Sequence, residues 1–106
     1  MSTLTLRITI NQDSTTATVK LEGRLATAWV PECMQALQSL LPGLGAKQLC
    51  LDLRGLTFVD RRGEQLLAEL YKEHRAQFLT STPLTKYFAE QAINTSNAEI
   101  PKDRQA

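Results

Sequence analysis

The residue types most able to do chemistry stand together in the segment LCLDLRGLTFVDRRGEQLLAEL, residues 49–70. An apolar run ends in Asp60, and Arg61, Arg62 and Gly63 then open an amphipathic helical pattern. A helix N-terminus carries partial positive charge, so an exposed arginine there is unfavourable by about 0.3 to 1 kcal/mol. Two guanidinium groups beside free backbone N–H groups would instead attract an anion, because they can bind carboxylate or phosphate bidentately.

A structural alternative for the two arginines is an ordinary solvated helix face. Glu64 and Glu69 follow Arg61 and Arg62 at helical spacing. Ion pairs at such spacing contribute only a few tenths of a kcal/mol on an exposed helix. The residue types alone are consistent with both interpretations, but only the first predicts a binding site for an acidic patch of a protein, a nucleotide or a lipid phosphate.

The other polar or thiol-bearing candidates favour structural roles. Asp60 suits the N-cap position of the helix, where alanine would cost about 1 kcal/mol. Gly63 lowers helix propensity, which indicates a close approach of the helix start to a strand or loop. Asp52 is a lone carboxylate in an apolar strand and is expected to reach solvent or bond to nearby backbone. Cys33 and Cys50 lie among apolar residues and are predicted to be buried.

Catalytic and metal-binding motifs are missing from the sequence. There is no Gly-rich phosphate loop, no G-x-S-x-G and no H-E-x-x-H, and His74 is the only histidine. The two cysteines are too few and too far apart in sequence to suggest a zinc site or a disulfide scaffold. We therefore expect a protein that is not an enzyme and that needs no metal or cofactor.

A cluster of hydroxyl groups lies at the end of the last expected strand. Thr80, Ser81 and Thr82 are the candidate phosphoacceptors of the chain. Residues of this kind more often form a turn and cap the following helix, so the structural role is the more frequent one.

Composition and charge narrow the class of protein. The chain has 106 residues, 42% of them hydrophobic and 22% charged, which is ordinary for one soluble globular domain. A formal net charge of +1 provides no field for nucleic acid. No apolar run approaches the roughly 18 residues of a membrane span. The start, MSTLTLRITI, lacks the features of a secretory signal, so we expect a cytoplasmic protein without direct membrane insertion.

Hydrophobic periodicity predicts the elements that position these residues. Alternation over residues 4–10 and 15–23, with turn formers between, predicts an antiparallel hairpin. The later elements are a helix at 29–41, a strand at 47–53, a helix from 60, a short strand at 76–81 and a last short helix at 84–93. Right-handed β-α-β connections then give an α/β fold, with a mixed sheet of four or five strands and helices mainly on one face.

This element order, together with particular residues, resembles the STAS domain family of bacterial anti-sigma factor antagonists and sulphate transporter tails. The similarity covers about residues 3–93. It rests on Gly23-Arg24-Leu25, on Leu51-Asp52-Leu53 followed by Gly55, on Thr57-Phe58-Val59-Asp60 leading to Gly63, and on Leu66-Leu67. The resemblance implies one STAS-like domain over residues 1–93, and the polar, aperiodic residues 94–106 are expected to form a disordered tail.

The resemblance also implies a partner, and the sequence departs from the family where that partner acts. In phosphorylatable members, the second serine of Asp-Ser-Ser-Gly accepts phosphate from an anti-sigma factor that is a kinase. Arg61 and Arg62 occupy the two serine positions here, and arginine has no hydroxyl group. The implied phosphorylation switch therefore does not carry over to this site.

The leading hypothesis is a non-catalytic protein-interaction module that regulates transcription by binding a partner such as an anti-sigma factor. Its contact residues would be Asp60, Arg61, Arg62, Gly63 and Arg24. There are two alternatives: a binding domain for a nucleotide or anion at the same helix start, and an accessory STAS subunit of a membrane lipid transporter. The sequence does not define the oligomeric state.

Overall fold

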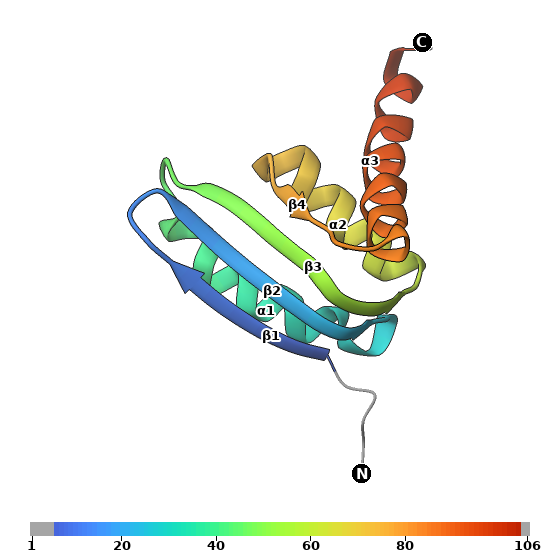
Figure 1. Ribbon diagram of the computed structural model, residues 1–106. Coiled ribbons are helices and arrows are strands. Elements are labelled where there is room, and N and C mark those ends of the chain that lie inside the picture. Colours follow the sequence, from blue (N-terminus) through green and yellow to red (C-terminus); the bar gives the residue numbers. More distant parts are fainter. Residues whose placement is uncertain (1–5, 105–106) are drawn as a thin grey trace.

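Over the residues that the structure describes, the chain forms a four-stranded sheet with three α-helices (Figure 1). The computed structural model describes residues 6–104, with side chains described as far as Asn97. Leu4 of the predicted first strand thus lies outside the described residues. The elements are β1 (Leu6–Gln12), β2 (Thr16–Leu25), the 3-10 turn η1 (Thr27–Trp29), α1 (Val30–Leu40), the 3-10 turn η2 (Leu41–Gly43), β3 (Gln48–Val59), α2 (Arg61–His74), β4 (Gln77–Leu79) and α3 (Pro83–Arg104).

The sheet has the strand order β1-β2-β3-β4. The β1–β2 pair is antiparallel, whereas β2–β3 and β3–β4 are parallel. The predicted hairpin and the predicted mixed α/β architecture are therefore confirmed. Because β2 and β3 are parallel, their C-terminal ends meet at one edge of the sheet, and η1 and α2 begin there (Figure 1).

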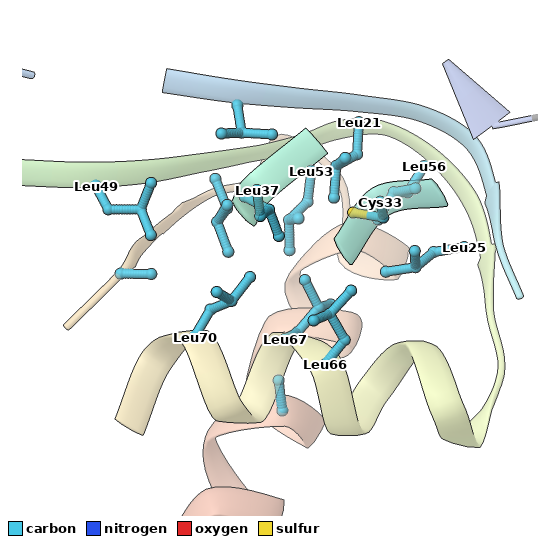
Figure 2. Packing of buried hydrophobic residues seen from close by; sticks show 14 of the residues in the cluster. Leu21, Leu25, Cys33, Leu37, Leu49, Leu53, Leu56, Leu66, Leu67 and Leu70 are labelled. Carbon is cyan, nitrogen blue, oxygen red and sulfur yellow. The ribbon is translucent and has the colours of Figure 1, made fainter. Parts of the chain in front are cut away.

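Alternation along the strands builds the core between the sheet and the helices. Leu21 of β2 and Leu49 and Leu53 of β3 lie on the side of the sheet that faces the leucines of α2, and Cys33 of α1 packs in the same cluster (Figure 2). All of these side chains are buried. Burial raises the pKa of the Cys33 thiol to about 11, so this thiol stays protonated and unreactive at neutral pH. Its predicted role as a packing residue is confirmed.

The buried carboxylate in β3 is satisfied within its own strand. Asp52, only 4% exposed, accepts hydrogen bonds from the backbone N–H of Arg54 at 3.1 Å and from two nitrogens of the Arg54 guanidinium at 2.9 Å each. The guanidinium hydrogen bonds lower the pKa of Asp52 despite the opposing effect of burial. The expected bond to nearby backbone is thus present, and the ion pair with Arg54 is an addition that the sequence pattern did not reveal.

The last helix is longer than the sequence pattern predicts. α3 continues to Arg104, so the predicted disordered tail from residue 94 is wrong for the helical part. The physical reason is that polar side chains hold this part of α3 in place. The hydroxyl of Thr95 donates to the carboxylate of Glu64 in α2, and Ser96 is buried with its hydroxyl bonded to the carbonyl of Ile93. Apolar periodicity cannot detect such a contact.

Candidate functional site

The carboxylate of Asp60 connects two segments, η1 and the start of α2, at the C-terminal edge of the sheet. As predicted, Asp60 is the N-cap of α2, and its Oδ1 accepts a hydrogen bond from the backbone N–H of Gly63 at 2.9 Å. Its Oδ2 accepts from the backbone N–H of Thr27 at 2.7 Å and from the Thr27 hydroxyl at 2.8 Å. Thr27 lies 33 residues earlier in the chain and begins η1. One side chain therefore fixes η1 to the start of α2.

The pKa of Asp60 shows that this carboxylate is held in its ionised form. Partial burial raises the pKa, but the hydrogen bonds from Gly63 and Thr27 outweigh it, and the net pKa lies below the ordinary value of 3.8. Negative charge therefore sits at the positive end of the helix dipole. The anion-attracting end of α2, predicted from the sequence as a ligand site, is thus already served by a carboxylate of the protein itself.

Gly63 allows the start of α2 to touch the end of β2. A Cβ atom at Gly63 would lie 2.3 Å from the carbonyl oxygen of Leu25 and 2.9 Å from its Cγ. The same carbonyl oxygen accepts a hydrogen bond from the backbone N–H of Asp60 at 3.2 Å. The predicted close approach is therefore present. Since Gly63 is buried and both Asp60 oxygens have donors, these two residues position the site and leave its outer surface to other side chains.

Arg61 and Arg62 are exposed at the first turn of α2. Among the side chains of residues 6–97, neither forms an ion pair or hydrogen bond. The structural alternative placed them against Glu64 or Glu69, but Glu64 instead accepts from the hydroxyl of Thr95. Two guanidinium groups with unfilled donors thus face solvent from a backbone that Asp60 holds in place.

A third arginine, Arg24, lies near the C-terminal end of β2, at the same edge of the sheet. The guanidinium carbon of Arg24 lies 4.2 Å from the ring centroid of Phe58, a cation–π contact. The two residues are aligned because β3 has one more residue than β2, Thr57, between the pairs Gly23–Leu56 and Arg24–Phe58. Phe58 is 37% exposed and lies two residues before Asp60 in the sequence. Four arginine and aromatic side chains at or just after the C-terminal ends of β2 and β3 are grouped under one name, the arginine surface: Arg24, Phe58, Arg61 and Arg62. Phe58 was not among the contact residues predicted from the sequence.

The hydroxyl cluster at 80–82 has the expected capping role. The Thr82 hydroxyl accepts from the backbone N–H of Thr85 at 3.1 Å, and the Thr85 hydroxyl accepts from the backbone N–H groups of Ser81 and Thr82 at 3.0 Å each. These bonds satisfy backbone groups where α3 begins. β4 pairs with β3 only as far as Asp52, whereas β3 continues to Val59. The sheet therefore gives Thr80, Ser81 and Thr82 no direct connection to the arginine surface.

The described part of the chain offers neither a metal cluster nor a membrane helix. Within it, no three His, Cys, Asp or Glu side chains are grouped so that they could hold a metal ion. Likewise, none of its helices has both the length and the apolar character needed to cross a bilayer.

Comparison with known proteins defines the class to which this fold and site belong. The family model described as "Mlab, STAS domain" matches residues 8–92. The chain therefore belongs to the STAS domain family, as its resemblance to that family indicated. A search of curated proteins gives no significant match.

Two solved structures share the fold. An anti-sigma factor antagonist from Mycobacterium paratuberculosis is 18% identical with a TM-score of 0.69, over 81% of this chain and 76% of that one. An uncharacterised protein with a SpoIIAA-like fold from Shewanella loihica PV-4 is 15% identical with a TM-score of 0.55, over 78% of this chain and 73% of that one. At these identities the likeness establishes the fold.

The contact between Gly63 and Leu25 predicts a steric effect. Gly63→Ala should lower the free energy of unfolding by about 2 kcal/mol or more, because the new methyl group meets a backbone carbonyl that cannot move aside alone. Gly43→Ala is the matched control, since nothing lies within 4 Å of a Cβ there. Urea unfolding of both variants measures the difference, and equal stabilities would contradict the close approach.

The lowered pKa of Asp60 predicts a pH dependence of stability. A carboxyl whose pKa is lower in the folded chain stabilises it above the unfolded pKa, and this contribution is lost as pH falls through the folded pKa. Asp60→Asn keeps one acceptor oxygen and replaces the other with an NH2 group, which cannot accept the hydrogen bonds made there. It should therefore cost about 1 kcal/mol at pH 7 and progressively less below about pH 4. Thermal unfolding of both proteins between pH 7 and pH 2 tests this. A constant difference across that range would argue against an ionised Asp60 bridge.

Proposed function

We propose that this STAS protein is a non-catalytic regulatory interaction module that resembles an anti-sigma factor antagonist and binds an acidic patch of a cytoplasmic protein partner. The contact is the arginine surface. One observation carries the proposal: Arg61 and Arg62 are exposed and, within the described side chains, have no carboxylate partner. Arginine forms bidentate bonds with carboxylates, so this surface is suited to aspartate and glutamate side chains.

Rigidity supports the proposal. Asp60 ties the backbone of α2 to η1, and Gly63 packs against Leu25. The arginines therefore extend from a backbone that is already ordered, which lowers the entropy cost of binding. Phe58 adds an exposed aromatic ring beside Arg24, and aromatic and arginine side chains are enriched at binding hot spots.

A protein partner fits this region better than a small ligand. The ionised carboxylate of Asp60 already accepts hydrogen bonds at the start of α2, where a bound anion would have to lie. The hollow beside Arg62 is an open groove of about 360 Å³ between α1 and α2. Small-molecule sites bury most of the ligand surface, and an open groove does not.

Arginine at both serine positions makes the contact constitutive. A partner that binds through Arg61 and Arg62 cannot be released by phosphorylation of these residues. Release would then have to depend on the partner, on its concentration or on competition for the same surface.

Charge reversal tests the proposal. The double variant Arg61→Glu, Arg62→Glu should reduce capture of the cellular partner more than tenfold, because two attractive contacts become repulsive. The control Arg7→Glu, Lys86→Glu changes net charge equally at exposed positions on β1 and α3. Affinity capture with mass spectrometry measures the loss, and circular dichroism should show that both variants unfold near the wild-type temperature.

The same experiment identifies the partner. Recovery of an anti-sigma factor supports the first hypothesis, and recovery of a lipid transporter subunit supports the alternative. Unchanged capture by the arginine variant would contradict the proposed surface. Stabilisation of the wild-type chain that grows with nucleotide or phosphate concentration, and that the arginine variant lacks, would favour a small ligand instead.

A further inference from the structure

A continuous groove runs between α1 and α2. One hollow of about 360 Å³ lies near the start of α2, and a second of about 80 Å³ lies farther along both helices. The two hollows share Met34, Leu66 and Glu69, so they form one groove. Its floor is mainly apolar and is formed by Val30, Met34, Leu37, Leu41, Leu66 and Leu70.

Two opposite charges line the α2 side of this groove. Arg62 and Glu69 both line the larger hollow and are both exposed. They are separated by two helical turns, about 10 Å along the axis, and therefore lie on the same side of α2. Neither is ion-paired with a side chain in residues 6–97. Gln65 and Leu66, which also line the hollow, lie midway between the two charges.

We propose that this groove is the interface of a homodimer with two-fold symmetry, in which the α2 helices of two copies lie antiparallel. An antiparallel pair centred between Gln65 and Leu66 places Arg62 opposite Glu69 of the partner subunit. Two-fold symmetry then places Glu69 opposite the partner subunit's Arg62. Both unpaired charges gain a partner, and the apolar floor lies at the centre of the contact. Two-fold interfaces are self-complementary in this way.

The charge pattern selects one orientation and one occupant. A parallel arrangement would place like charges together and align the two helix dipoles, and both effects are unfavourable. The antiparallel arrangement opposes the dipoles and pairs the charges. A second copy of the chain therefore supplies the complement of both Arg62 and Glu69 with no further residue required.

The dimer has a consequence for partner binding. Arg62 belongs both to the groove and to the arginine surface. A dimer would cover Arg62, one of the three arginines of the arginine surface, and would therefore compete with the partner. The inference itself does not depend on the proposed function, because it rests on the groove and its two charges.

Sedimentation velocity of the full chain, from about 1 µM to 1 mM, tests the dimer. The wild type should shift from monomer to dimer with rising concentration, and less so at high salt. Arg62→Glu and Glu69→Arg should each raise the dissociation constant about tenfold or more, since each creates two like-charge contacts. An equimolar mixture of the two variants should form a heterodimer of near wild-type strength, because every facing pair is then of opposite charge.

Charge reversals outside the groove are the controls. Arg7→Glu on β1 and Glu90→Arg on α3 should leave the dimer unchanged. A wild type that stays monomeric throughout, a dimer that neither groove variant weakens, or a mixture that fails to restore it would each overturn the inference. Glu69→Arg retains Arg61 and Arg62, so it should still capture the partner. Loss of dimer and loss of capture are therefore separate results.

Discussion

The carboxylate of Asp60 is the interaction on which the shape of this surface depends. It caps α2 through Gly63 and holds the start of η1 through Thr27, whose donors lie 2.7 and 2.8 Å away. Parallel pairing of β2 and β3 brings these two segments to the same edge, and the absence of a side chain at Gly63 lets α2 touch Leu25. The parallel strand pairing, the helix cap and the close helix–strand contact therefore all lie at the start of α2.

This arrangement explains why positive side chains are tolerated at a positive helix end. Asp60 remains ionised because its hydrogen bonds lower its pKa, so its charge offsets the helix dipole. Arg61 and Arg62 can then point outward without a carboxylate partner in the described part of the chain. The first turn of α2 in this STAS protein thus presents fixed positive charge to solvent.

The features of this structure that depend on neighbouring residues could be predicted from the sequence, whereas the contacts between residues far apart in the chain could not. Alternation gave the hairpin, and the position of Asp60 before an amphipathic segment gave the start of α2, because both effects act within a few residues. The bond to Thr27 spans 33 residues, and the contact of Arg24 with Phe58 depends on an extra residue in β3. Neither of these two contacts produces a periodic pattern in the sequence from which it could be predicted. The length of α3 was missed for a related reason, since beyond residue 93 a polar side chain, Thr95, bonds to Glu64 of α2.

The most direct test of this account is an NMR pH titration of the backbone amide protons of Thr27 and Gly63. If one ionised carboxylate accepts from both amides, their chemical shifts should change together with a single midpoint below 3.8, the ordinary value for aspartate. The same midpoint should be absent from the Asp60→Asn variant. Separate midpoints, or a shared midpoint at or above 3.8, would contradict the claim that the ionised Asp60 carboxylate holds η1 to the start of α2.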